Sequence, residues 1–599
     1  MKLPFTEKRY VRTLTRFRGI KAGHTAELCD LTAKTSGTLE PVPEKHKSAH
    51  LLSEPGGIGY DGAFFYASGG GFYYDGVRRG DLSPGQKQFA VSDGTVLIYP
   101  DKKYFRRETK YYRYAKSELV EASPSFTPAD AVKLAAISDG APETLAEGEL
   151  YFDTARGLLY KRSQGALTSL GAPSKEVFYS LYTERFGSLE RTVSFCRNKN
   201  ERIHIKTVAA DGSEGNTHLE LITMNSNVEY ALDFSFLSPG EKVAITGLEP
   251  SETAHYGKCS KLMDGAKVVS VSPGRLIIEN TPGIDKVNCN DDISGEVSFR
   301  KLLPELDCVM SVDGRIWGAK GEFIYSSRLN SVSDFTGGEG ISAAYLGRTG
   351  LPDPILACAD LGSIPVFLTR GAIIKAIRKG NTYELSITPA SGIRPDSPMS
   401  AVAASGSLFY LSESGFMRYD GQDPKRIDLD AKLEVGAGVG GTDGTNYLFS
   451  DGDRQYVYDP YAERWHFETP GAYAYTRADG SAAFLVREGE AYRIITCAGE
   501  GECLPQSPSL ALAPIDEGTL EYKTYAAFAV SAKLEAGGAL QLYAAYDGGA
   551  PVPVLTLRGE GKRSLARARI APRRCVYLTL SFRADAPFEL YSVSREYFK

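Results

Sequence analysis

The stretch Ser407-Leu-Phe-Tyr-Leu-Ser-Glu-Ser-Gly-Phe-Met-Arg-Tyr-Asp-Gly421 contains two short aromatic runs, joined at Ser414-Gly415 and closed by Asp420-Gly421. Runs rich in aromatic and β-branched residues that end at Gly, Asp or Pro are typical of antiparallel strands. The stretch therefore predicts a β-hairpin.

The same pattern recurs along the chain, with a strand, a turn and a second strand about every 8 to 12 residues. Two further copies are Tyr73-Tyr-Asp-Gly76 and Gln455-Tyr-Val-Tyr-Asp-Pro460, the second followed by Trp465 as in one strand of a kelch-type blade. Self-similarity at roughly 40 to 50 residues favours a β-propeller, because each four-stranded blade buries a face against its neighbours. Two or three separate β-sandwiches would produce similar spacing and remain the alternative.

Two changes of pattern divide the chain. The aromatic rhythm stops between about residues 175 and 304, and alternating apolar strands replace it after about residue 514. The predicted fold is all-β, a β-propeller with an inserted small β-barrel-like domain and a C-terminal β-sandwich. The predicted parts are a basic N-terminal arm (1–50), the first part of the propeller (51–174), the inserted domain (175–304), the second part of the propeller (305–513) and the sandwich (514–599). One short helix is expected at residues 128–137, capped by Thr127.

Composition excludes several classes of protein. The 599 residues are 42 % hydrophobic and 24 % charged, which excludes global disorder. The net charge of −5 argues against a protein that binds nucleic acid through its entire surface. The sequence contains no run of 18 apolar residues, so no membrane span is predicted. Residues 2–21 carry seven Lys or Arg against one Glu without the apolar core of a secretory signal. This basic arm has a net charge of +6, and the rest of the chain has a net charge of −11. The two oppositely charged parts could therefore contact each other between subunits.

The cysteines predict a reduced protein. There are nine, an odd number, and no Cys-x-x-Cys occurs, so neither a disulfide framework nor a zinc ribbon is expected. Cys497 and Cys503 are interpreted as two free thiols, with a disulfide between them as the alternative.

Three motifs suggest chemistry on first inspection. Gly436-Ala-Gly-Val-Gly-Gly441 has the letters of a dinucleotide-binding loop, but a turn and a strand follow instead of a helix, which predicts a flexible loop between blades. His46 and His50 are expected to be surface histidines, since their segment shows no ligand pattern. Asn288-Cys-Asn-Asp-Asp292 offers oxygen donors for calcium, although a solvated turn is the preferred interpretation.

Two more segments have alternative interpretations. Ser311-Val-Asp-Gly-Arg-Ile-Trp317 approaches the sialidase Asp-box, which is itself a turn motif. Residues 101–116 hold seven Lys or Arg among five aromatics, so a platform for single-stranded nucleic acid is the alternative to an outer strand pair or a subunit contact. No catalytic, cofactor-binding or metal-binding residue and no cofactor is predicted.

One segment resembles a known family. Asp307-Cys-Val-Met-Ser-Val-Asp-Gly-Arg-Ile-Trp-Gly318 followed by Glu322-Phe-Ile-Tyr-Ser-Ser-Arg-Leu329 is similar to a virion protein family of tailed phages and prophages. The segment keeps the family's Arg, Trp-Gly and Tyr-x-Ser. It lacks the Asn before Arg315 and the Gly-Asp-Pro before Phe335.

Other stretches match the same family in order along most of the chain: Ile98-Tyr-Pro-Asp-Lys102, Pro239-Gly-Glu-Lys-Val-Ala-Ile-Thr-Gly247, Ile364-Pro-Val-Phe-Leu-Thr-Arg-Gly371, Val457-Tyr-Asp-Pro460 with Trp465, and Pro572-Arg-Arg-Cys575 with Ser594-Arg-Glu-Tyr597. The resemblance implies a propeller with an inserted β domain and a C-terminal sandwich.

The resemblance also implies a function without enzymatic activity. It implies a homo-oligomeric ring in the virion tail, a hexamer in similar nozzle proteins, assembled in the host cytoplasm. The expected partners are adaptor, portal-proximal or tail-tip components, with DNA passing through the lumen without specific binding. The alternative function is a glycan-binding or glycan-cleaving propeller at the tail tip.

Overall fold

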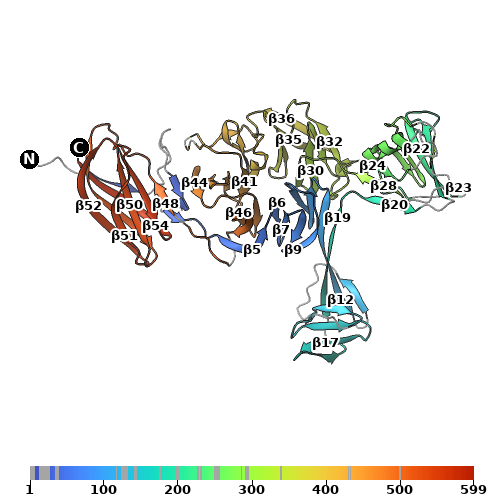
Figure 1. The fold of residues 1–599 in the computed structure, drawn as a ribbon, viewed down its shortest axis with the longest axis horizontal. Coiled ribbons are helices and arrows are strands. Elements are labelled where there is room, and N and C mark those ends of the chain that lie inside the picture. The colour runs from blue at the N-terminus through green and yellow to red at the C-terminus, as the bar shows by residue number, and fades with distance from the viewer. Residues whose placement is uncertain are drawn as a thin grey trace, which may run out of the picture. The chain divides into compact units, whose positions relative to one another are not determined.

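The computed structural model describes residues 7–12, 27–33, 39–115, 118–122, 132–140, 145–173, 177–196, 201–225, 228–229, 233–248, 256–284, 287–289, 296–336, 340–429, 431, 433–497, 501–506 and 508–598. The chain forms two compact units, residues 1–90, 98–101 and 190–599 in the first and 91–97 and 102–189 in the second. Nearly every element is a strand (Figure 1). Within the described residues no helix is long and apolar enough to cross a membrane.

Six four-stranded antiparallel blades lie in the first unit, which confirms the predicted propeller. Their strands are β6 (Pro55–Tyr60), β7 (Phe64–Ser68), β8 (Gly71–Tyr74), β9 (Val77–Asp81); β29 (Cys308–Val312), β30 (Arg315–Lys320), β31 (Phe323–Ser326), β32 (Tyr345–Arg348); β33 (Ala357–Asp360), β34 (Pro365–Leu368), β35 (Ala372–Lys379), β36 (Thr382–Pro389); β37 (Val402–Ala404), β38 (Ser407–Ser412), β39 (Gly415–Tyr419), β40 (Lys425–Arg426); β41 (Val439–Thr442), β42 (Tyr447–Ser450), β43 (Gln455–Asp459), β44 (Arg464–Glu468); and β45 (Tyr475–Ala478), β46 (Ser481–Glu488), β47 (Ala491–Thr496) with β5 (His46–Leu52).

The first strands of the blades line up around a ring. Neighbouring contacts run from β6 to β45 and on through β41, β37 and β33 to β29. The two ends of this series, the blades that begin with β6 and β29, are connected by residues at the start of β10 (Gln88–Ser92). The Gln88 side chain bonds to the backbone of Asp307 and Val309 at 2.8 and 2.9 Å, and the Lys87 amide donates to the Gly56 carbonyl at 2.6 Å. These bonds connect residues 87–88 to the blades β6–β9 and β29–β32, so the first unit itself links the two ends of this series of blades.

The turns explain why these residues form hairpins. Asp313-Gly314 and Asp479-Gly480 join the first two strands of their blades, and all four residues have φ between 48° and 82°. Two successive left-handed residues make the turn whose twist suits a two-residue hairpin, and Asp-Gly adopts it readily. The predicted Asp75-Gly76 turn is confirmed, since these residues have φ of 51° and 75° and join β8 to β9.

The last blade takes its outer strand from the N-terminal region. β5 pairs antiparallel with β47, with Tyr492 opposite Leu52 and Thr496 opposite His46. Leu52 is fully buried between these elements. Residues 46–50, expected in the arm, are therefore part of a blade.

A small β domain occupies residues 190–304, which is most of the inserted domain predicted at residues 175–304. One nine-stranded sheet surrounds its core and follows the order β20-β28-β24-β25-β26-β22-β21-β27, with β23 beside β22. The strands are β20 (Thr192–Cys196), β21 (Glu201–Val208), β22 (His218–Asn225), β23 (Val228–Glu229), β24 (Lys242–Thr246), β25 (Ala266–Ser272), β26 (Arg275–Glu279), β27 (Val287–Cys289) and β28 (Glu296–Leu302). The short helix α1 (Tyr256–Cys259) precedes β25.

The second unit contains strands that the sequence had assigned to the propeller up to residue 174, and one strand, β19, that it had assigned to the inserted domain. They are β12 (Lys103–Ala115), β13 (Glu118–Ala122), β14 (Val132–Lys133), β15 (Ala136–Ser138), β16 (Leu150–Asp153), β17 (Leu158–Ser163), β18 (Ala166–Gly171) and β19 (Val177–Ser188). The helix predicted at residues 128–137 is wrong for its described part, because β14 pairs with β19 and β15 with β16. Backbone pairing with distant strands thus overrides the local pattern.

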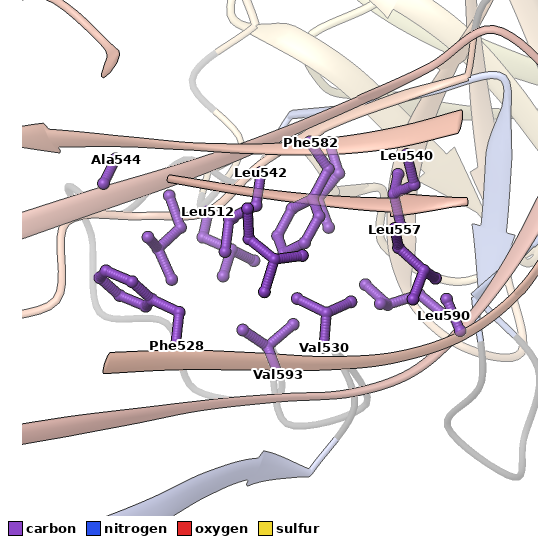
Figure 2. Close-up of a cluster of buried hydrophobic side chains, with 14 of the residues drawn as sticks. Leu512, Phe528, Val530, Leu540, Leu542, Ala544, Leu557, Phe582, Leu590 and Val593 are labelled. Atoms are coloured by element: carbon purple, nitrogen blue, oxygen red, sulfur yellow. The ribbon is translucent and has the colours of Figure 1, made fainter. Parts of the chain in front are cut away.

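The C-terminal region is a β-sandwich, as predicted. One sheet has the order β3-β4-β54-β49-β52 with β1 beside β54, and the other contains β48-β53-β50-β51. Figure 2 shows Phe528, Val530 and Val593 of the first sheet facing Leu542 and Phe582 of the second. The strands are β1 (Glu7–Arg12), β3 (Leu31–Ala33), β4 (Leu39–Pro41), β48 (Ser509–Ala511), β49 (Lys523–Leu534), β50 (Ala539–Tyr546), β51 (Val552–Arg558), β52 (Arg563–Cys575), β53 (Leu578–Ala584) and β54 (Phe588–Phe598).

Strand β2 (Glu27–Cys29) joins the sandwich to a blade. It pairs with β48 on one side and with β44 on the other, so one nine-stranded sheet runs from β41 to β51. The described part of the predicted N-terminal arm is therefore built into sheets of the same chain.

Candidate functional site

Arg315, the arginine of the family-like segment, is a buried structural residue. Its side chain is 3 % exposed, and its guanidinium donates to the carbonyls of Ser327, Ile341 and Ala343 at 2.6 to 2.7 Å. A guanidinium offers five N–H donors in a fixed plane, which lets one residue satisfy several carbonyls. Arg315 thus fixes the connection between β31 and β32 to the body of its blade.

Trp317 occupies the core of the same blade. The side chain is fully buried and lies edge-on against Tyr383, with ring centroids 4.7 Å apart. A Cβ added at Gly318 would lie 2.6 Å from the Cys308 carbonyl, so the strand admits only glycine there. The Trp-Gly pair therefore determines packing, and the similarity to the phage family rests on core residues of a blade.

A buried ion network lies where the N-terminal region meets the blade β41–β44. The ammonium of Lys45, 1 % exposed, lies 3.0 Å from Glu468 and 3.8 Å from Asp30, and donates to the Thr469 carbonyl at 2.7 Å. Asp30 is fully buried and accepts two hydrogen bonds from Thr469. Each buried charge has a partner, as burial of charge requires.

Glu468 is held ionised in this network. Burial disfavours its carboxylate, but the ammonium of Lys45 and the hydrogen bond to His466 lower its pKa to about 2. The junction therefore carries fixed charges at neutral pH and depends on all of them being present.

A cleft of about 500 Å³ opens between the blade β6–β9 and the last blade. It is lined by residues 53–57, 67–71 and 82–87 together with Tyr473, Ala474, Leu485, Glu490 and Tyr492. Tyr473 and Tyr492 meet edge to face with centroids 4.8 Å apart, and Tyr473 is 40 % exposed. Aromatic rings beside a carboxylate and glycine-rich backbone provide surfaces on which a sugar can stack and form hydrogen bonds.

Lys87 in this cleft is already paired. Its ammonium lies 2.6 Å from Asp101 and donates to the Ser83 hydroxyl at 2.8 Å. Burial opposes ionisation of Asp101, yet Lys87 and the Ser83 amide lower its pKa. This pair stabilises the loop at residues 82–87. Glu54 and Glu490 are the carboxylates of the cleft that have no ion pair among the described residues.

Glu44, His46 and Cys503 come together at the beginning of β5. The Cys503 thiol lies 3.4 Å from His46 Nδ1 and 3.6 Å from a Glu44 carboxylate oxygen. Limited burial and the negative charge of Glu44 raise the pKa of Cys503. His46, predicted to be a surface histidine in a segment without a ligand pattern, is half-buried, and strand pairing brings the Cys503 thiol beside it and Glu44. Cys497 and Cys503 are both free thiols, as predicted.

Residues 436–438 lie in the connection between two blades, as predicted, but residues 439–441 do not. Val439–Thr442 is β41, the first strand of a blade. A Cβ at Gly441 would lie 2.3 Å from Tyr475, and one at Gly440 would lie 2.6 Å from the Ser400 carbonyl. The glycines permit adjacent blades to approach closely.

The remaining candidate segments have structural roles or fall partly outside the description. Residues 103–113 pair with β19, which confirms a strand pair, but β12 lies between β11 (Thr95–Tyr99) and β19 in its sheet and is not an outer strand. Asp313-Gly314 makes the Asp-box-like stretch a hairpin turn. His50 is half-buried against Phe64, and burial lowers its pKa. Asn288 lies in β27, but residues 290–292 of the calcium candidate lie outside the described residues.

No family model matches the chain, and no curated protein matches it. Three solved structures are similar to it at low TM-scores. The extracellular domain of a one-component system from B. thetaiotaomicron is 8 % identical, with 95 % of this chain and 98 % of that chain covered and a TM-score of 0.18. The surface component PorZ of the type-IX secretion system of Porphyromonas gingivalis is 9 % identical, with coverage of 88 % and 75 % and a TM-score of 0.16.

The third is a family 43 arabinoxylan arabinofuranohydrolase from Bacillus subtilis, solved with cellotetraose. It is 10 % identical, with 48 % of this chain and 94 % of that chain covered and a TM-score of 0.13. At these TM-scores the similarities carry no argument about this chain.

Proposed function

We propose that this protein is a structural subunit of a phage tail, one protomer of a homo-oligomeric ring in a nozzle or hub. The observation that carries the proposal is the continuous nine-stranded sheet from β41 to β51. Backbone hydrogen bonds through β2 connect a propeller blade to the sandwich, and the buried network of Lys45, Asp30 and Glu468 reinforces the junction. Such a joint suits a part that transmits load between tail components.

The family-like residues support the same proposal. Arg315 and Trp317 maintain the core of a blade, so the residues that resemble the phage family have a structural role in a propeller, the fold that the resemblance implies. In this function the ring encloses a channel through which DNA passes without specific binding, and it contacts adaptor or tail-tip proteins. The protein acts in the virion tail without enzymatic activity.

Electron microscopy and virion proteomics test the proposal. We expect the purified chain to form closed rings of uniform symmetry, and the protein to be present in virions at the copy number of that ring. A chain that stays monomeric at high concentration and is absent from virions would overturn the proposal.

The cleft beside Tyr473 and Tyr492 favours a second candidate function, binding of a glycan at the tail tip. Glycan-array binding should be lost in Tyr492→Ala and kept in Tyr461→Ala, because Tyr461 is 74 % exposed and does not line the cleft. Release of reducing ends from the bound glycan would indicate cleavage. Absence of binding to host envelope polysaccharides would contradict this second function.

A further inference from the structure

Backbone hydrogen bonds fix the two chain segments that carry Glu44, His46 and Cys503. His46 and Cys503 form an isolated antiparallel bridge. On either side of it the Leu504 amide donates to the Lys45 carbonyl at 2.7 Å and the Lys47 amide donates to the Glu502 carbonyl at 2.9 Å. The relative positions of the three side chains thus follow from the strand register.

The donor atoms of these side chains have the spacing of metal ligands. All three lie within 4.8 Å of one another, with Sγ of Cys503 3.4 Å from His46 Nδ1 and 3.6 Å from Glu44 Oε2. Zinc bonds of about 2.3 Å to sulfur and about 2.1 Å to nitrogen or oxygen place tetrahedral ligands about 3.6 Å apart. Thiolate, imidazole and carboxylate are all zinc ligands, whereas calcium takes six to eight oxygens.

We propose that Glu44, His46 and Cys503 form a zinc site that secures the strand closing the propeller. Zinc takes Sγ of Cys503, Nδ1 of His46 and one oxygen of Glu44, and water occupies the fourth position. Binding releases the thiol proton to solvent and needs no oxidant. His46 begins β5, and Cys503 lies beyond the end of β47, so the metal links β5 to the chain segment that follows the last strand pair of this blade.

Local charge suits the ion. Thiolate and Glu44 carboxylate neutralise the two charges of zinc. Lys47, the residue after His46, is paired with Glu488 at 3.3 Å and Glu502 at 2.9 Å, so its charge is compensated. The same three side chains without metal form weak thiol hydrogen bonds, and the site therefore does not require zinc in order to fold.

Cobalt substitution of the full chain tests the site. After chelator dialysis, one equivalent of Co²⁺ should produce a thiolate-to-cobalt charge-transfer band and tetrahedral d–d absorption. Cys503→Ser and His46→Ala should lose both, and Cys497→Ser, which alters a nearby free thiol outside the cluster, should keep them. Absence of the band in the wild-type chain, or its persistence in Cys503→Ser, overturns the proposal.

Alkylation of Cys503 gives a readout that leaves this cysteine in place. Zinc should protect Cys503 from iodoacetamide in the wild-type chain and fail to protect it in Glu44→Gln and His46→Ala. Hydrogen exchange should also slow within β5, about elevenfold when free zinc is about ten times its dissociation constant. Equal protection of Cys503 from alkylation in the variants, or unchanged hydrogen exchange in β5 of the wild type, contradicts the proposed zinc site.

Discussion

Asp30 accepts hydrogen bonds from the amide and the hydroxyl of Thr469, at 2.9 and 2.8 Å, although 439 residues separate the two in the chain. Asp30 follows β2, and Thr469 follows β44, so the contact lies where the sandwich sheet becomes a propeller blade. The charge of Asp30 also lies 3.8 Å from the ammonium of Lys45. One side chain thus serves both the backbone and the ion network of the junction.

Asp30→Asn should destabilise the chain by about 2 kcal/mol or more, because the charge is lost from a buried network. Asparagine tolerates the φ of 53° at this position, so backbone strain does not contribute. Urea unfolding measures the change. Asp423→Asn, at an exposed site, should stay within about 0.5 kcal/mol of the wild type, and equal effects of the two substitutions would contradict the role of Asp30.

Glu468 should make stability depend on pH in the acid range. Its folded-state pKa of about 2 lies below the ordinary value of 4.5, so its contribution is complete above about pH 5 and is lost as the pH falls toward 2. This difference in pKa corresponds to a contribution of about 3 kcal/mol to the free energy of unfolding. Unfolding free energies measured from pH 7 to pH 2 should therefore fall more steeply for the wild type than for Glu468→Gln. Parallel curves would contradict this assignment.

Arg315→Lys should loosen the connection between β31 and β32. A single ammonium cannot reach all three carbonyls that the guanidinium satisfies, so we expect about 2 kcal/mol of destabilisation. Hydrogen exchange in peptides covering residues 327–336 and 340–343 should accelerate. The matched change Arg378→Lys, on an exposed part of β35, should leave exchange unchanged.

Gly441→Ala should cost about 2 kcal/mol or more, because the added methyl group would overlap Tyr475 of the next blade. Gly94→Asn is the control, since its φ of 66° is accessible to Asn and no atom lies within 4 Å of the added Cβ. Thermal unfolding compares the two. Similar melting temperatures for both variants would show that the blades can separate to admit a side chain.

Local patterns predicted those features that neighbouring residues determine. Asp75-Gly76 and Asp313-Gly314 are turns because Asp and Gly readily adopt the left-handed backbone conformation that such a turn requires. The apolar residues at 128–137 suited a short helix equally well, and only pairing of β14 and β15 with other strands decides against it.

Long-range pairing determined what the sequence could not reveal. Glu44 and His46 are close in sequence, but Cys503 joins them only because β5 lies beside β47. The cleft has the same origin, since Tyr473 and Tyr492 belong to the last blade while residues 53–57 follow β5. Neither the register of β5 nor its choice of partner leaves a local signal in composition or periodicity.

The position of β5 also constrains how the protein can be made. Residues 46–52 leave the ribosome early, but their partner at residues 491–496 is synthesised more than four hundred residues later. The early strand must wait with its backbone groups hydrogen-bonded to water until the last blade emerges. A nascent chain that stops before residue 491 lacks β47, so only chains translated past that point can pair β5 in the last blade.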